Sequence, residues 1–317
     1  MSNRPLSTLS LPSSTLSALT RGGYETVQDL AASTAESLAE DLNISLPSSQ
    51  AVFSATRGGR ALPMTQSAAS MVGATRKYST GCGPVDRLLD GGLKRGHILE
   101  ISGPPGSGKE ILAANTVKSF IALGEKVIFV DMQNMVPPAA LNKILQKSTS
   151  MPTDYQSFLY HLNLYTLPDL MIFLRNLPSY LTAHPTTALL VLNSLSFPFQ
   201  RSVGRNDGIR HTVLERVKQT LTKACASTNL TVVITSHLAT KMLKPDGSAG
   251  NFDTGSKAVM TPNLGITYLP SGKTHRVILI PQTRTTGVVR LLSSPTHVQG
   301  QHPVQEESYD TIRGMMQ

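Results

Sequence analysis

Residues 103–110 read GPPGSGKE and form a candidate phosphate-binding loop with an unusual last position. The pattern G-x-x-x-x-G-K-[ST] is met by Gly103, Gly108 and Lys109, but Glu110 stands where a serine or threonine is expected. In nucleotide hydrolases that hydroxyl ligates Mg²⁺, while backbone N–H groups and the lysine bind the phosphates. The predicted nucleotide-binding residues are Gly103, Pro104, Pro105, Gly106, Ser107, Gly108, Lys109 and Glu110.

The carboxylate of Glu110 allows three interpretations. A carboxylate about 4 Å from a phosphate costs about 4 kcal/mol at an effective dielectric constant of about 20, which is on the order of a thousandfold in affinity. A metal ion between the two groups reverses the sign, and Glu110 is then itself a Mg²⁺ ligand. Alternatively, Glu110 only favours the first turn of its helix, by about 0.3–1 kcal/mol, in a loop that no longer binds nucleotide. Binding without appreciable hydrolysis, no binding, and slow hydrolysis therefore all remain open.

A strand must precede this loop and a helix must follow it, and the sequence supplies both. Residues 97–102, HILEIS, are predicted to be a buried strand, and residues 109–123 a helix that ends at Gly124. Beyond them, strands are predicted at 126–130, 163–167, 188–192 and 231–235, helices at 137–147, 168–177 and 212–225, and three final strands at 264–269, 276–280 and 288–292. This order predicts an α/β fold with a central, mostly parallel sheet and an antiparallel C-terminal extension. The phosphate loop then lies at the carboxyl end of the first strand.

The chain is predicted to contain two folded parts. Residues 1–53 form a small all-helical N-terminal domain, in which cap residues such as Thr34 precede short apolar periods. Residues 54–77 are rich in Gly, Ala and Ser without an apolar period and are predicted to be a linker. The α/β core occupies residues 78–295, and residues 296–317 are predicted to be a flexible polar tail.

The composition restricts the class of protein. Cys82 and Cys225 are far apart in the sequence and the 8 histidines lack metal-ligand spacing, so neither a disulfide framework nor a zinc site is expected. The longest apolar run, Ala188–Leu192, is far shorter than the roughly 20 residues of a membrane span, so no membrane partner is predicted. The net charge of +9 comes mainly from residues 201–317. This excess fits either a polyanionic partner or a solvated basic face.

The start of the α/β core resembles the ATPase core of RecA-like strand-exchange recombinases, especially the eukaryotic recombinase paralogues. The resemblance lies in residues 78–109, YSTGCGPVDRLLDGGLKRGHILEISGPPGSGK, and continues in VLNSLSFPFQR (191–201) and TVVITSHLATK (231–241). Residues 22–45, GGYETVQDLAASTAESLAEDLNIS, are similar to the helix-hairpin-helix-like domain of these proteins. The resemblance covers residues ~16 to ~292 and implies a RecA-like P-loop core with ATP and Mg²⁺ as cofactors.

This resemblance assigns roles to individual positions, several of which depart from the family's pattern. Gln133 occupies the position of the catalytic glutamate that orients the attacking water, so it is a degenerate catalytic position. Asn193 replaces the acid that holds Mg²⁺ through water, and Glu110 replaces the hydroxyl ligand, so these two residues are the candidate metal positions. His237 replaces the glutamine that senses the γ-phosphate.

The resemblance also places two DNA-binding loops. Residues 201–210 lie where the family carries its first loop, and residues 241–257 correspond to the second. The predicted DNA-binding residues are Arg201, Arg205, Arg210, Lys241, Lys244 and Lys257, whose phosphate contacts would be salt-dependent and independent of sequence. Without the resemblance, both stretches also fit ordinary solvated loops.

The function implied by the resemblance is that of a recombinase paralogue in homologous-recombination DNA repair. Such a protein binds ATP with weak or absent hydrolysis, and binds single-stranded DNA. The family's F-x-x-A filament contact is imperfect here, since Ala55 stands one place too early after Phe53, so a heteromer with another RecA-like recombinase or paralogue is expected. The alternative is an active DNA-dependent ATPase with rearranged Mg²⁺ ligands. A P-loop kinase for a small metabolite is disfavoured because no arginine-rich lid is evident.

The expected location is the nucleus, with the mitochondrion as the alternative. Residues 1–24 contain Arg4 and Arg21 and no acidic residue, as mitochondrial presequences do. Pro5 and Pro12 interrupt the amphipathic helix that a presequence requires.

Overall fold

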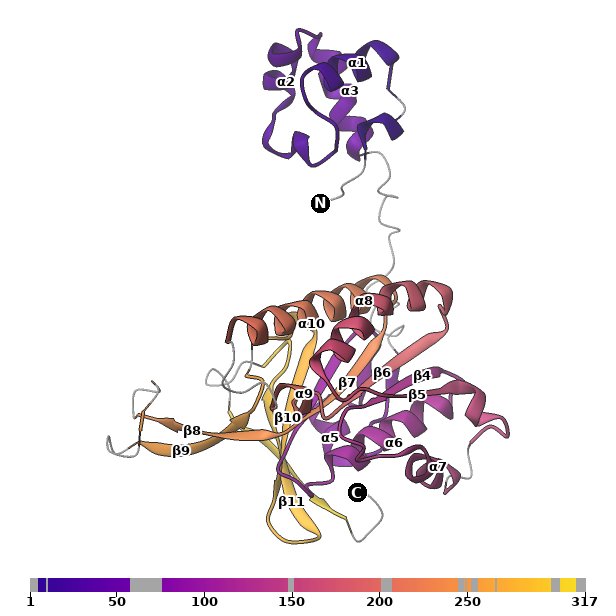
Figure 1. The fold of residues 1–317 in the computed structure, drawn as a ribbon, viewed down its shortest axis with the longest axis vertical. Helices are drawn as coiled ribbons and strands as arrows, with labels where there is room; N and C mark the ends of the chain where they lie inside the picture. Colours follow the sequence, from indigo (N-terminus) through magenta and orange to yellow (C-terminus); the bar gives the residue numbers. More distant parts are fainter. Residues whose placement is uncertain are drawn as a thin grey trace. The chain divides into compact units, whose positions relative to one another are not determined.

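The structure of the protein is a computed structural model that describes residues 5–9, 11–57, 76–147, 151–200, 207–244, 248, 250–251, 256–265, 267–297 and 303–311 (Figure 1). The chain divides into two compact units, Met1–Val72 and Gly73–Gln317. Each unit packs around apolar side chains of its own. Within the described ranges, no helix is both long enough and apolar enough to cross a membrane.

The first unit is helical, as the sequence predicted. Its elements are α1 (Ser13–Arg21), α2 (Ala35–Leu42) and α3 (Leu46–Arg57), with the 3-10 turns η1 (Leu6–Thr8) and η2 (Asp29–Ala32). The Thr34 hydroxyl caps α2 by accepting a hydrogen bond from the backbone N–H of Ser37 at 3.2 Å. Because α3 continues to Arg57, the predicted linker begins with helical residues. Its residues 58–75 lie outside the described part of the chain.

The second unit is built on an eight-stranded sheet with the order β12-β11-β10-β3-β7-β6-β4-β5. Its strands are β3 (Ile98–Ser102), β4 (Lys126–Asp131), β5 (Leu159–Asn163), β6 (Thr187–Asn193), β7 (Thr231–Ser236), β10 (Thr274–Pro281), β11 (Thr286–Ser293) and β12 (Gln305–Asp310). The strands from β10 to β5 run parallel, whereas β10, β11 and β12 pair antiparallel. This mixed, mostly parallel sheet with an antiparallel C-terminal part confirms the predicted fold class.

Helices cover both faces of the sheet (Figure 1). On one face lie α6 (Lys109–Ile121) and α7 (Pro138–Gln146), and on the other lie α8 (Leu167–Ala183) and α10 (Asp207–Ser227). The side chains of β3 alternate between the two layers, since Leu99 and Ile101 pack with α6 while Ile98 packs with α8 and α10. Burial on both faces explains why β6 and β7 read as continuous apolar runs.

The remaining elements of the core are short. They are α5 (Gly83–Leu88), α9 (Phe197–Gln200), the antiparallel pair β1 (Lys77–Tyr78) and β2 (Leu93–Lys94), and the 3-10 turns η3 (Tyr155–Phe158) and η5 (Ser271–Lys273).

Two predicted strands are wrong. The strand expected at 163–167 lies at 159–163, because the Thr166 and Asp169 side chains form a capping box and residue 167 already begins α8. The described residues of 264–269 form no strand, although three of them are buried in the core. Gly265 has a φ of 81°, which ends any extended backbone there.

A two-stranded antiparallel ribbon flanks the predicted second DNA-binding loop and includes its end residues 241–243 and 257. It consists of β8 (Leu238–Leu243) and β9 (Lys257–Pro262), and it stands out from the core in Figure 1. At its root the backbone N–H of Asn263 donates to the carbonyl of His237 at 2.9 Å. The short strands were missed because their mixed lysine, threonine and methionine content gives no clear two-residue period.

The predicted flexible tail is wrong in its central part, where β12 pairs with β11 along six residues. Tyr309 of β12 is buried, and the Arg87 guanidinium donates to the Glu307 carboxylate at 3.0 Å. A second ion pair joins Arg290 of β11 to Glu306 of β12. These contacts fix a segment whose polar composition suggested none. Residues 298–302 and 312–317 lie outside the described residues.

Candidate nucleotide site

The glycine loop joins β3 to α6 and has the backbone of a phosphate cradle. Gly106 and Gly108 adopt left-handed φ values of 76° and 85°, which side chains other than glycine rarely tolerate. A Cβ atom at Gly103 would lie 2.4 Å from the Ser107 hydroxyl, so any larger residue would force the Ser107 side chain to move. The loop ends at the first turn of α6, where backbone N–H groups lack helical partners and favour an anion.

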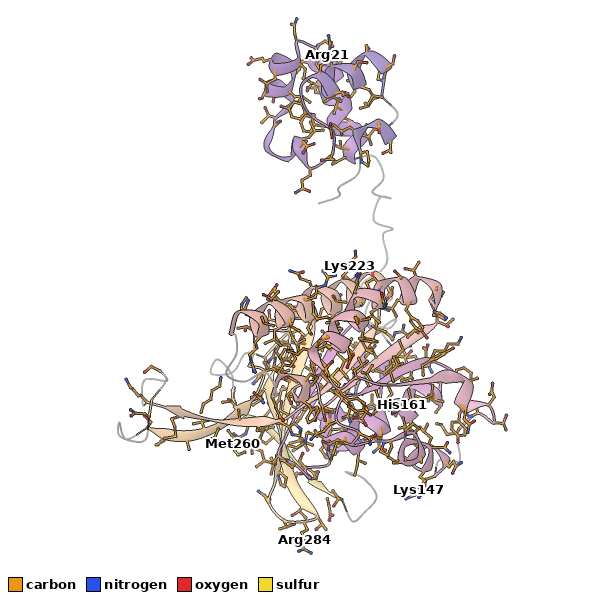
Figure 2. The ribbon with its side chains drawn as sticks, viewed as in Figure 1. Arg21, Lys147, His161, Lys223, Met260 and Arg284 are labelled. Carbon is orange, nitrogen blue, oxygen red and sulfur yellow. The ribbon has the colours of Figure 1, made fainter. Side chains whose placement is uncertain are left out.

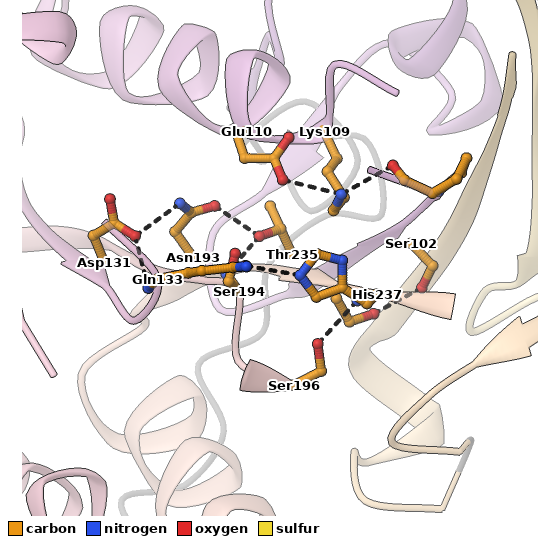
Figure 3. A network of polar contacts seen from close by, with 12 residues as sticks. Ser102, Lys109, Glu110, Asp131, Gln133, Asn193, Ser194, Ser196, Thr235 and His237 are labelled. Carbon is orange, nitrogen blue, oxygen red and sulfur yellow. Dashed lines mark hydrogen bonds and ion pairs between the residues drawn. The ribbon is translucent and has the colours of Figure 1, made fainter. Parts of the chain in front are cut away.

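Lys109 lies fully buried beneath this loop (Figure 3). Its ammonium donates to the Pro104 carbonyl at 3.1 Å and lies 3.0 Å from Glu110 Oε1. The carboxylate is 8% exposed, and its Oε1 lies outside hydrogen-bonding geometry despite the short distance. The lysine charge is therefore already neutralised by the neighbouring residue.

The carboxyl ends of β4 and β6 meet beside the loop. Asp131 and Asn193 end these strands as register partners, and Asn193 Nδ2 donates to Asp131 Oδ1 at 3.2 Å. Asp131 also accepts the backbone N–H groups of Gln133 at 3.2 Å and Val136 at 2.7 Å. Since Asp131 and Asn193 are both fully buried, these hydrogen bonds replace their contacts with water.

The orientation of the Asn193 amide follows from Thr235. The Thr235 hydroxyl oxygen accepts the backbone N–H of Ser194 at 2.7 Å, which leaves its proton free to donate to Asn193 Oδ1 at 2.7 Å. Ser194 itself holds a left-handed φ of 60°. The amide oxygen therefore already accepts a proton donor, and the amide nitrogen is used by Asp131. Sequence reasoning missed Thr235, because it reads as the last residue of an apolar strand.

Gln133 and His237 contact one another directly (Figure 3). His237 Nε2 lies 2.8 Å from Gln133 Oε1, and the His237 backbone N–H donates to the Ser196 hydroxyl at 3.0 Å. Burial lowers the pKa of His237 below its ordinary value, and the positive charge of Lys109 lowers it further. The ring is thus neutral near pH 7 and donates from Nε2 to the glutamine oxygen.

These side chains do not fit a magnesium ion. Mg²⁺ requires an octahedron of oxygen ligands, usually with one or two carboxylates. The Glu110 carboxylate faces the Lys109 ammonium, and the Asn193 amide oxygen accepts the Thr235 hydroxyl. Both candidate metal ligands therefore already have partners within the protein. No group of three His, Cys, Asp or Glu residues able to hold a metal occurs among the described residues. The loop backbone, in contrast, fits a phosphate group, since the buried Ser107 hydroxyl has no hydrogen-bond partner within the described structure.

The predicted DNA-binding residues fall into three groups. Lys241, Lys244 and Lys257 are exposed on or beside the ribbon, and Lys241 and Lys257 share one face of it by strand register. Arg210 instead turns toward the core, where it donates to the Asn263 carbonyl at 2.9 Å and lies over the Phe199 ring.

The other two predicted residues, Arg201 and Arg205, lie outside the described residues.

The ribbon also carries an exposed apolar side chain, since Met260 of β9 is 54% exposed (Figure 2).

The mostly parallel sheet with a glycine loop between β3 and α6 defines a P-loop nucleotide-binding core. Residues 78–167 match the family model described as "ATPase: KaiC", which implies nucleotide binding. The chain is 28% identical over 169 residues to "DNA repair and recombination protein RadB" of Thermoplasma acidophilum, covering 53% of this chain and 70% of that protein.

Two eukaryotic relatives match as well. "DNA repair protein RAD51 homolog 3" of Dictyostelium discoideum is 26% identical over 187 residues, covering 51% of this chain and 49% of that protein. "DNA repair protein RAD51 homolog 4" of Mus musculus is 34% identical over 132 residues, covering 39% of each chain. The matches thus span less than half the length of both eukaryotic relatives. The chain is thus similar to RecA/RadB-like recombinases, and its distant relatives include eukaryotic RAD51 paralogues.

We predict that Asn193→Asp destabilises the core. The substitution places a second carboxylate against Asp131 where an amide N–H donated, and an uncompensated buried charge costs about 3 kcal/mol. The new carboxyl would have a raised pKa, so the folded state binds its proton more tightly and the penalty shrinks as the pH falls. Urea denaturation at pH 7 and pH 5 measures both effects.

The matched control is Asn176→Asp, which adds the same charge at an exposed site within α8. It should change the free energy of unfolding by less than about 0.5 kcal/mol. Equal effects of the two substitutions at pH 7 would show that the Asp131–Asn193 contact does not determine the stability of this edge.

Proposed function

We propose that the protein is a recombinase-paralogue accessory factor in homologous-recombination DNA repair, which binds nucleotide but hydrolyses ATP weakly or not at all. The observation that carries the proposal is that amides occupy both degenerate acid positions and are already hydrogen-bonded, Gln133 to His237 and Asn193 to Asp131 and Thr235. The names of the matched relatives support a role in DNA repair and recombination.

The side chains near the loop lack the groups that hydrolysis requires. A general base must accept a proton from water, and the Gln133 amide cannot do so. His237 is held neutral, but its Nε2 faces the glutamine oxygen and not an open position. Without an acid at residue 193 there is also no charge to hold Mg²⁺ through its water shell. The proposed roles of Gln133 and His237 are therefore structural links between strand ends, and no longer those of a water activator and a phosphate sensor.

Nucleotide binding is supported by the parts of the loop that contact phosphate. The glycines keep their left-handed backbone, the first turn of α6 offers N–H groups, and Lys109 is retained. The residues proposed to hold the phosphates of ATP are those of the loop, 103–110. ATP binding without turnover would stabilise the core, and the protein would act through its partners.

The proposed partners are single-stranded DNA and another RecA-like recombinase or paralogue. The ribbon supports single-stranded DNA as a partner, because three exposed lysines lie on or beside it. The root of the ribbon is hydrogen-bonded to the backbone of His237. Basic side chains that meet phosphates bind in a salt-dependent, sequence-independent manner. Co-purification of a second RecA-like chain from cells tests the heteromer, and a nuclear location is the corresponding proposal.

We predict that Glu110→Thr will not restore ATP hydrolysis. The substitution returns the hydroxyl, but Gln133 and Asn193 remain unable to activate water or to hold the metal. Phosphate release is measured with and without single-stranded DNA, and Lys109→Ala sets the background. The contrary outcome is that the natural chain releases phosphate in a reaction that DNA stimulates and that Lys109→Ala abolishes. That result would establish the competing function, an active DNA-dependent ATPase with rearranged Mg²⁺ ligands. Robust turnover in Glu110→Thr would place the hydrolytic glutamate elsewhere.

We also predict that replacing Lys241, Lys244 and Lys257 with Ala weakens single-stranded DNA binding and flattens its salt dependence. Each lost phosphate contact reduces the slope of log K against log salt by about 0.7, so the triple variant should lose about 2. Fluorescence anisotropy across a salt series measures the slope. The matched control replaces Lys147, Lys223 and Arg284, which are exposed elsewhere on the core (Figure 2). An identical slope in the two triple variants would refute the assignment to the ribbon.

A further inference from the structure

We propose that the phosphate loop binds nucleotide phosphates without a divalent metal, and that the Glu110 carboxylate competes with them for Lys109. This inference rests on the proposed nucleotide binding and adds the regulation of that site. A metal-dependent loop pairs its lysine with phosphate and its hydroxyl with the metal. Here an acid stands in place of the hydroxyl, and it faces the lysine.

The first step concerns the charge of Lys109. Its ammonium is wholly buried and has one contact to the Pro104 carbonyl and one to the Glu110 carboxylate. A buried ammonium must be paired, and in the absence of ligand its counter-ion is Glu110. A phosphate that enters the loop therefore meets a neutral pair in place of a free cation, and the two anions compete for the same lysine.

The second step concerns the metal. A cation could relieve the repulsion between Glu110 and phosphate only if other oxygens completed its shell. The nearest such candidates are used within the protein, because Asn193 Oδ1 accepts the Thr235 hydroxyl and Asp131 accepts three N–H donors. A single carboxylate that is already ion-paired is a poor Mg²⁺ site. The phosphates must then be bound by the loop alone.

The third step is that the loop retains an unmet hydrogen-bond donor that suits an anion. The hydroxyl of Ser107 is buried and has no hydrogen-bond partner within the described structure. A phosphate oxygen would accept from Ser107 and from the N–H groups at the start of α6. Such an anion would draw Lys109 toward itself and release the Glu110 carboxylate toward solvent.

The His237 and Gln133 side chains add no positive charge. His237, which comes from the end of β7, is neutral because burial and Lys109 lower its pKa, and the Gln133 side chain is an uncharged amide. At the end of β4, Asp131 adds a negative charge. Each extra phosphate thus brings negative charge that these side chains do not offset. We therefore expect ADP to bind at least as tightly as ATP.

The test is a titration of the full chain with a fluorescent ADP derivative, in Mg²⁺ and in EDTA, with inorganic pyrophosphate as competitor. The natural chain should bind with affinities that agree within about twofold in the two buffers. Glu110→Gln keeps the shape of the side chain but removes its charge, and should tighten binding at least about tenfold in both. Lys109→Ala should lose binding, whereas Glu215→Gln, on α10 across the sheet, should match the natural chain.

One result would overturn the metal-free inference, and a different result would overturn the proposed nucleotide binding. If Mg²⁺ tightens binding to the natural chain more than about tenfold and Glu110→Gln removes that gain, Glu110 is a metal ligand and this inference is wrong. If neither the natural chain nor Glu110→Gln binds in either buffer, while thermal unfolding shows both to be folded, the proposed nucleotide binding itself fails.

Discussion

The buried charge of Lys109 is the constraint on which the rest of the site depends. An ammonium with no exposed surface must have a counter-ion, and the loop provides one in the next residue. In a metal-dependent relative that charge is reserved for phosphate, and the hydroxyl at the following position is reserved for the metal. The single change to Glu110 alters both arrangements, because it neutralises the lysine and removes the ligand.

At the strand ends beside the loop, hydrogen bonds within the protein likewise occupy the polar side chains. Asp131 is a buried carboxylate that is stabilised by N–H donors, including the amide of Asn193, and an acid at 193 would oppose it. Gln133 and His237 are likewise a neutral pair that links β4 to the root of the β8–β9 ribbon. The carboxyl edge of the sheet is therefore linked by hydrogen bonds between these side chains. A core of this kind can remain folded and present its ribbon without turning over nucleotide.

Much of this fold could be predicted because the signals are local. The glycine loop and the continuous apolar runs of β6 and β7 identify the parallel sheet directly. What could not be predicted depends on contacts between distant residues. The pairing of β12 with β11 and the contact of Gln133 with His237 join segments that no sequence period connects. The motif and the resemblance named the candidate site residues, but neither predicted the inward turn of Arg210 toward Asn263.

The most direct test is a crystal structure of the full chain grown with ADP and Mn²⁺, with anomalous data collected to locate the metal. Mn²⁺ favours the same oxygen ligands as Mg²⁺, and its anomalous scattering identifies its position. We predict diphosphate density in the loop against Lys109, the Glu110 side chain turned away from the ammonium, and no manganese peak in the site. A manganese ion ligated by Glu110 between the carboxylate and the phosphates would contradict the account.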